Sequence, residues 1–219
     1  MRAARPKRTA LKPESEHWAL PVQQERSLAT RERIVAAAEW AFAEKGYEGA
    51  RISDIAKRAG CSVGAVYFRF ADKDALFFAI VETFRAGVRE RLPVLAASPF
   101  ASPEDVVERF VSGAATQARE HRGLFRAIVE RGFDRSLAMD MMFSIRDELQ
   151  AFLETALGKF GRKYSDLSFM VRMMSQMVYG FLITGVLNDR APTRLDETRT
   201  MRELIAVLNA YLKSAEGRK

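Results

Sequence analysis

The residues between 61 and 70 are the part of the chain whose types and spacing suggest chemistry. This stretch, CSVGAVYFRF, places Gly64 and Ala65 just before Tyr67. Small residues let a backbone approach a partner closely, and the Tyr67 hydroxyl can donate a hydrogen bond to a phosphate oxygen. Val63 can touch the methyl group of a thymine. These groups suit non-covalent recognition of a nucleic acid rather than catalysis.

Two short helices must position this stretch. The apolar spacing predicts one helix over residues 52–59, ended by a tight turn at Gly60, and another over residues 63–68. Ser62 can cap the second of these, because its hydroxyl can accept a backbone N–H that lacks a helical partner. Two helices joined by about three residues form a helix-turn-helix, whose second helix enters the major groove of DNA. The side chains expected to face inward and hold that helix are Val66 and Phe70.

Helices also flank the helix-turn-helix. We expect one from about residue 27 to Lys45, stopped by Gly46, and a fourth that Asp72 caps and that ends near residue 91. Beyond a boundary marked by prolines, helical spacing recurs at about 103–119, 123–131, 135–160, 165–188 and 197–214. No alternating strand pattern persists in the sequence. The fold class is therefore all-α, with an N-terminal three-helix helix-turn-helix domain followed by a C-terminal helical bundle.

Three regions follow from this pass along the chain: a basic leader (1–26), the helix-turn-helix domain with its fourth helix (27–91) and a C-terminal domain (92–219). The 219 residues carry a net charge of +7, with most of the excess in the first 91 residues, which suits a polyanionic partner. The leader contains several prolines and is either a flexible tail or a basic arm that lies along DNA. It lacks the apolar run of a signal peptide.

Catalytic, metal-binding and membrane functions are disfavoured by composition. The chain has two histidines, His17 and His121, and no Gly-rich phosphate loop or hydrolase motif. Cys61 is the only cysteine, so no intrachain disulfide or cysteine metal cluster can form, which fits the cytoplasm. The segment 167–188 has Arg172 as its one charge, and a buried helix is favoured over a membrane span. We expect no enzyme activity, no cofactor, no metal and no membrane partner.

Four linked motifs carry a resemblance to a known family. They are I-x-x-A-A-x-x-x-F-x-x-x-G-Y from Ile34, D-I-A-x-x-A-G-x-S from Asp54, G-x-x-Y-x-x-F from Gly64 and K-x-x-L from Lys73. With this order and spacing, residues 31–81 resemble the DNA-binding domain of the tetracycline-repressor (TetR) family. The resemblance covers under a quarter of the chain. It implies a cytoplasmic, ligand-responsive regulator, most often a repressor that binds a palindromic operator as a dimer.

The resemblance also implies where DNA is contacted: Arg51, Ser53, Ser62, Val63, Gly64, Ala65, Tyr67, Phe68 and Lys73. Structural alternatives exist for three of these, since Ser62 could serve only as a cap, Phe68 as packing and Gly64 as a point where helices cross. The family often has a capping Thr where this chain has Arg51. Arg51 cannot cap in that way, but it could reach a phosphate or a guanine edge.

The C-terminal half is expected to hold an effector and to dimerise. Met and Phe residues concentrate there, and flexible Met side chains suit cavities for varied apolar ligands, although they also fill ordinary cores. The expected effector contacts are Phe125, Met139, Met142, Phe143, Met170, Met173, Met174, Met177 and Phe181. The last two apolar helices, 165–188 and 197–214, either pair with those of a second chain or belong to the core. An effector could also act with the opposite sign, and a helix-turn-helix could serve a protein partner instead of DNA.

Overall fold

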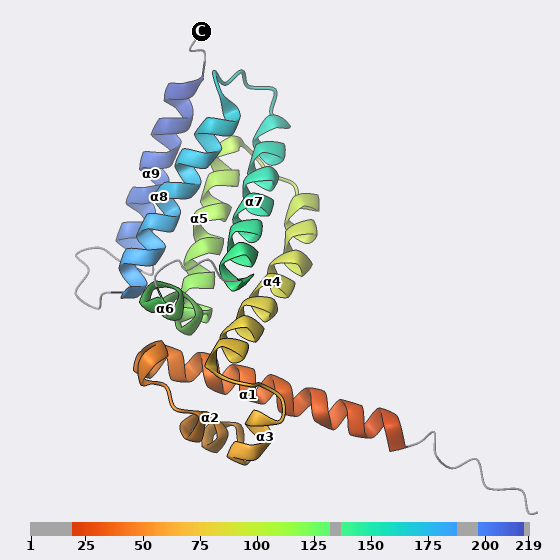
Figure 1. Ribbon diagram of the computed structural model, residues 1–219. Helices are drawn as coiled ribbons and strands as arrows, with labels where there is room; N and C mark the ends of the chain where they lie inside the picture. Colours follow the sequence, from red (N-terminus) through yellow and green to blue (C-terminus); the bar gives the residue numbers. More distant parts are fainter. Residues whose placement is uncertain (1–18, 132–136, 188–196, 217–219) are drawn as a thin grey trace, which may run out of the picture.

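The computed structural model describes residues 19–131, 137–187 and 197–216, and the elements within these ranges are helices (Figure 1). This confirms the predicted all-α class. The helices are α1 (Ala19–Gly49), α2 (Ile52–Ala59), α3 (Val63–Tyr67), α4 (Lys73–Ala97), α5 (Pro103–Glu120), α6 (Arg122–Arg131), α7 (Leu137–Gly158), α8 (Leu167–Leu187) and α9 (Thr198–Ala215).

The first helix begins earlier than the sequence suggested. Residues 19–26, expected to belong to a flexible leader, form the first turns of α1. Pro21 is compatible with this start, because a proline in the first turn lacks an N–H that would have had no helical partner. The expectation for residues 1–18 lies outside the described residues. The predicted stop at Gly46 is confirmed as a break with φ 73°, after which one further turn reaches Gly49.

The fourth helix is longer than predicted and joins the two parts of the molecule. Its expected cap is confirmed, since the Asp72 side chain accepts the N–H of Ala75 at 2.8 Å. The helix passes through Pro93 and ends at Ala97, so the predicted boundary at residue 91 falls inside one continuous element. Pro93 sits near the end of the helix, where Leu92 and Leu95 pack against the core of the bundle and help to hold the last turn in place.

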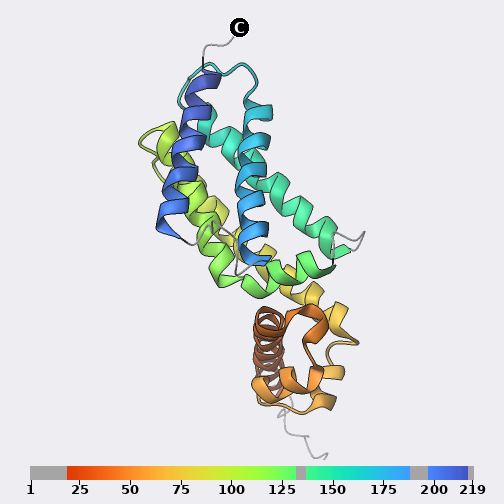
Figure 2. The same cartoon turned by 90° about the vertical axis from the view of Figure 1, so that its left-hand side faces the viewer.

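Two apolar clusters fill the interior. The upper cluster joins α5, α8 and α9 to the C-terminal part of α7, and these helices stand side by side above α6 and α1–α3 (Figures 1 and 2). The lower cluster joins α1–α4 to α6 and the start of α7, and includes Phe42, Phe77, Ile128 and Met139. The core of the helix-turn-helix region is therefore completed by residues of the C-terminal half.

The contact between α1 and α6 is especially close. A Cβ atom placed on Gly123 in α6 would overlap the backbone oxygen of Glu39 in α1 and would lie 2.8 Å from its carbonyl carbon. The ring of His121, just before α6, lies 3.0 Å from the Glu39 carboxylate. Only glycine fits where α6 crosses α1, so the crossing fixes how the bundle sits on the N-terminal helices.

Candidate nucleic-acid interface

The turn between α2 and α3 has the geometry that its sequence predicts. Gly60 adopts a left-handed conformation (φ 66°, ψ 41°) and its N–H bonds to the Lys57 carbonyl at 3.3 Å, while the Cys61 N–H bonds to the Ala56 carbonyl at 3.0 Å. These bonds satisfy carbonyl groups at the end of α2. The chain is thereby reversed tightly enough for α3 to pack across α2.

Two buried side chains and one cap hold α3, which is only five residues long. The Ser62 hydroxyl accepts the Ala65 N–H at 3.1 Å, which confirms the predicted cap. Val66 is fully buried and Phe70 is 6% exposed, so both face inward as expected. A helix this short gains little from its own hydrogen bonds, so its position depends on these contacts.

The outward face of α3 is apolar and open to solvent. Tyr67 is 54% exposed, Phe68 just after the helix is 84% exposed, and Val63 is also exposed. Phe68 therefore does not serve as packing, which rules out one structural alternative. Large apolar side chains gathered on one exposed surface mark a place where a partner binds.

Gly64 has no intramolecular reason to be glycine. A Cβ atom at this position would meet only the Ser62 hydroxyl, at 3.9 Å, so the alternative that Gly64 lets two helices cross is wrong. Ser62 and Gly64 are both exposed, and Ala65 is half-buried. At Gly64 the start of α3 thus presents its backbone to the outside with no side chain in front of it.

The first turn of α2 supplies two more predicted contacts. Arg51 is exposed and precedes α2 without any side-chain capping bond, as its residue type implies. Ser53 is exposed in the same turn. In the described residues neither side chain forms a hydrogen bond or close ion pair, although the hydrogen bond from Lys45, helped by the Arg51 charge, lowers the pKa of the nearby Asp54 carboxyl, so both are available to a ligand beside α2.

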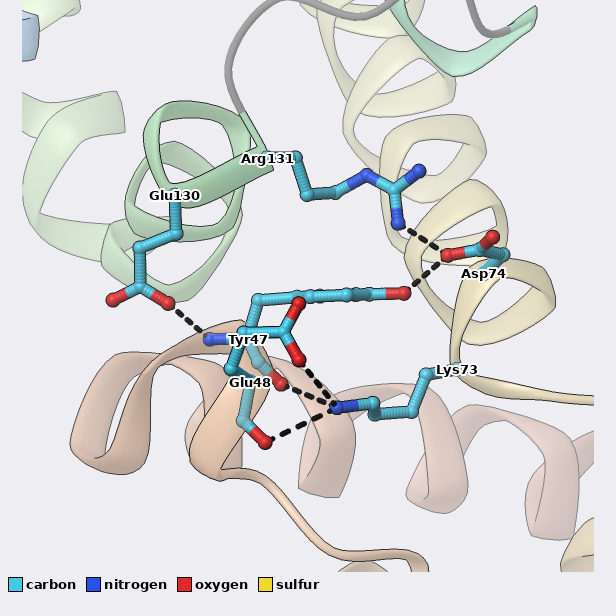
Figure 3. Close-up of polar contacts among 6 residues, drawn as sticks. All are labelled: Tyr47, Glu48, Lys73, Asp74, Glu130 and Arg131. Carbon is cyan, nitrogen blue, oxygen red and sulfur yellow. Dashed lines mark hydrogen bonds and ion pairs between the residues drawn. The ribbon is translucent and has the colours of Figure 1, made fainter.

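Lys73 differs from the other predicted contacts because its ammonium is already engaged. Its Nζ atom donates to the carbonyl oxygens of Tyr47 at 2.9 Å and Glu48 at 3.2 Å, at the end of α1 (Figure 3). The ammonium also lies 4.7 Å from the centre of the Tyr47 ring. Lys73 therefore ties α4 to α1, and a contact with phosphate stays a prediction.

Three residues that sequence reasoning missed, Asp74, Glu130 and Arg131, connect Tyr47 and α4 to α6 (Figure 3). The Tyr47 hydroxyl donates to the Asp74 carboxylate, and the Arg131 guanidinium donates to the same carboxylate oxygen. The Glu130 carboxylate accepts the Tyr47 N–H at 2.5 Å. The Gly-Tyr motif marked Tyr47, but nothing local marked its partners, because Arg131 lies 57 positions from Asp74.

This network changes the acidity of its members. The hydrogen bond from Tyr47, assisted by Arg131, holds the pKa of the Asp74 carboxyl below its usual value. Burial, together with the bond to Asp74, raises the pKa of the Tyr47 hydroxyl well above its usual range. Asp74 is therefore ionised and Tyr47 neutral near pH 7, which favours both bonds.

The predicted effector contacts are not brought together as one group. Phe125, Met139 and Met142 belong to the lower cluster, and a second set belongs to the upper one: Met170, Met174, Met177 and Phe181. Phe143 is 40% exposed and Met173 is 37% exposed. The structure therefore divides the predicted set among two interiors and the surface.

Helix α8 is apolar over nearly its whole length but is not enclosed. The stretch Leu167–Gly185 is long and apolar enough to cross a membrane by length and composition alone, and only 28% of it is buried. The expectation of a helix buried on nearly every side is wrong for the single chain, because its neighbours cover only part of it. Within the described ranges, no group of three or more His, Cys, Asp or Glu side chains could hold a metal ion.

A short capped helix with an exposed apolar and aromatic face, set by a tight turn on a second helix, defines the class of helix-turn-helix DNA-binding regulators. Comparison with known proteins agrees with this class. The family model described as "Bacterial regulatory proteins, tetR family" matches residues 34–80 of this chain. Residues 34–80 of this chain therefore match the DNA-binding domain of the tetR family of bacterial regulators.

Individual relatives support the assignment. An HTH-type transcriptional regulator of Bacillus subtilis, YdgC, is 25% identical over 74% of this chain and 85% of its own length. The A-factor receptor protein of Streptomyces griseus is 45% identical, but the match covers 27% of this chain and 22% of the receptor. A TetR transcription regulator from Haloarcula marismortui shares the fold, with a TM-score of 0.68 at 18% identity over 85% of this chain and 98% of that one.

Proposed function

We propose that the protein is a dimeric repressor that binds a palindromic operator and is released by a small, largely apolar effector. The observation that carries the proposal is the outward face of α3, where Val63, Tyr67 and Phe68 are exposed beside the open backbone of Gly64. In the major groove, Val63 is suited to thymine methyl groups, and Tyr67 to a phosphate oxygen.

The uncovered face of α8 and α9 supports dimerisation. Phe169 is 50% exposed on α8, Val207 is 55% exposed on α9, and both helices lie on the same side of the bundle (Figure 1). The small residues Gly180 and Ala210 lie in the same two helices, and a Cβ atom on Gly180 would meet nothing within 4 Å. We infer that the same helices of a second chain cover this face and that two α3 helices then meet two half-sites.

The release step uses α4. An effector that fits one arrangement of the bundle better than another shifts the dimer toward it. Because α4 runs unbroken from the turn after α3 to Ala97, a change in its tilt would alter the distance between the two α3 helices. The effector contacts we favour are those that share the upper cluster: Met170, Met174, Met177 and Phe181.

A binding experiment with selected DNA tests the proposal. Repeated selection from random duplexes should enrich an inverted repeat, and sedimentation should give a dimer on it. Tyr67→Phe removes a neutral hydrogen-bond donor, so it should weaken binding without changing the slope of log K against log salt, which depends on the phosphates that Lys and Arg neutralise. Tyr211→Phe, a matched change on α9, should leave the affinity for the same DNA unchanged. A protein that enriches no sequence and leaves no footprint would instead be an adaptor for a protein partner.

A further inference from the structure

A cavity of about 430 Å³ lies where the helix-turn-helix region meets the bundle. Its walls come from α1, the turn after α3, the first turns of α4 and the facing ends of α6 and α7. None of the predicted effector contacts lines it. Cavities that bind small molecules start at about 300 Å³, so this one has sufficient volume for a small ligand.

The charges in the wall leave one cation in excess. Asp74 is paired with Arg131 (Figure 3), and Glu82 lies 3.5 Å from Arg31. Among the described residues that line the cavity, Arg69 has no acidic partner. Its Nη1 atom donates to the Ala65 carbonyl at 3.1 Å, and its buried Nε atom meets no acceptor within the part of the chain that the structure describes. A donor buried without an acceptor is unfavourable, so an anion that reaches this guanidinium would relieve it.

The rest of the wall is apolar and partly aromatic. Phe70, Phe77 and Phe78 line it together with Leu137, whose side chain is 65% exposed. Phe70 and Phe77 are buried, so a flat apolar body would pack mainly against the half-buried Phe78 ring and Leu137, while a planar guanidinium binds a carboxylate through two parallel hydrogen bonds. We propose that this cavity binds a small monocarboxylate with an apolar, preferably aromatic, body, held at its charged end by Arg69.

The position of the cavity gives such a ligand a means of control. Arg69 and Phe70 follow α3 directly, whereas Leu137 belongs to the bundle, so one ligand would touch both parts. The cavity also borders the Asp74–Arg131 ion pair that links α4 to α6. The ligand would thus act at the base of the helix-turn-helix, separately from an effector in the upper cluster.

Titration of the full-length protein with 2-naphthoate, without DNA, tests this inference. We expect saturable binding of one naphthoate per chain. Arg69→Gln should weaken this binding about tenfold or more. Ala75→Leu should also weaken it, because the larger side chain fills part of the cavity. Arg119→Gln, an exposed arginine on α5, is the matched control and should bind as the wild type does. Because no DNA is present, the result is independent of whether the proposed repressor function holds.

The uncharged analogue 2-naphthamide gives a second measurement that needs no variant. It should bind the wild-type protein much more weakly than 2-naphthoate does. If circular dichroism shows that Arg69→Gln or Ala75→Leu does not fold, this comparison of acid with amide still tests the proposed role of the charged end. Absence of saturable binding, equal affinity for acid and amide, or undiminished binding by both folded variants would overturn the proposal.

Discussion

Gly123→Ala is expected to force apart the two helices that join the DNA-binding region to the bundle. The added Cβ atom would lie 2.8 Å from the Glu39 carbonyl carbon, whereas ordinary contact begins at 3.4 Å. That carbon alone requires a shift of about 0.6 Å, and the overlapping oxygen requires more. Because the obstacle is helical backbone, it cannot rotate away as a side chain could. We expect a loss of about 2 to 3 kcal/mol in the free energy of unfolding.

Gly113→Ala provides the matched control for this substitution. A Cβ atom on Gly113, an exposed residue of α5, would meet nothing within 4 Å. Alanine is favoured over glycine inside a helix, so this variant should gain about 0.5 to 1 kcal/mol. Thermal unfolding followed by circular dichroism measures both variants, at about 2 to 4 °C for each kcal/mol. If the two variants melt alike, the close crossing of α1 and α6 does not exist in solution.

Three further outcomes follow from named contacts. Ser62→Ala removes the oxygen that caps α3 and should lower the free energy of unfolding, measured by urea denaturation, by about 1 kcal/mol. Ser62→Asp keeps a capping oxygen and should lose much less. Equal losses for the two variants would argue against the cap. The hydrogen bond from Tyr47 makes the pKa of Asp74 lower in the folded protein than in the unfolded chain. The ionised carboxylate therefore stabilises the fold at pH values above the unfolded-state pKa. This stabilisation is lost as the pH falls through the folded-state pKa. The wild type should therefore lose more stability than Asp74→Asn between about pH 5 and pH 3, and parallel melting curves would contradict this. Ala210→Glu, on the exposed face of α9, should sediment as a monomer rather than a dimer. Ala151→Glu, on an exposed position of α7, should remain a dimer. If both variants sediment as dimers, the interface lies elsewhere.

The local features of the fold could be predicted from sequence because neighbouring residues determine them. The turn at Gly60 and the caps at Ser62 and Asp72 depend on residues no more than about four positions away, and all three were confirmed. Helix bounds in the C-terminal half agree within three residues, since a sustained apolar stripe has a definite start and end. The start of α1 was missed because a proline in a first turn does not stop a helix.

The links between distant parts of the chain could not be predicted in this way. The attachment of Lys73 to the end of α1 and the pairing of Arg131 with Asp74 arise only once α1, α4 and α6 meet. The Met residues between 139 and 177 are close in sequence, but α7 and α8 contribute them to different clusters. An apolar helix such as α8 indicates that a neighbour must cover it, and its sequence does not say whether that neighbour belongs to the same chain.

The shared lower cluster limits how this protein can be re-engineered. Phe42 and Phe77 in the N-terminal helices pack in one interior with Ile128 and Met139 from α6 and α7. A fragment cut after α4 would leave that interior open to water, and a chimera that joins residues 1–91 to a foreign sensor would have to import α6 and the first turns of α7 as well. The transplantable module is thus larger than the segment that defines the family, and it is discontinuous along the chain.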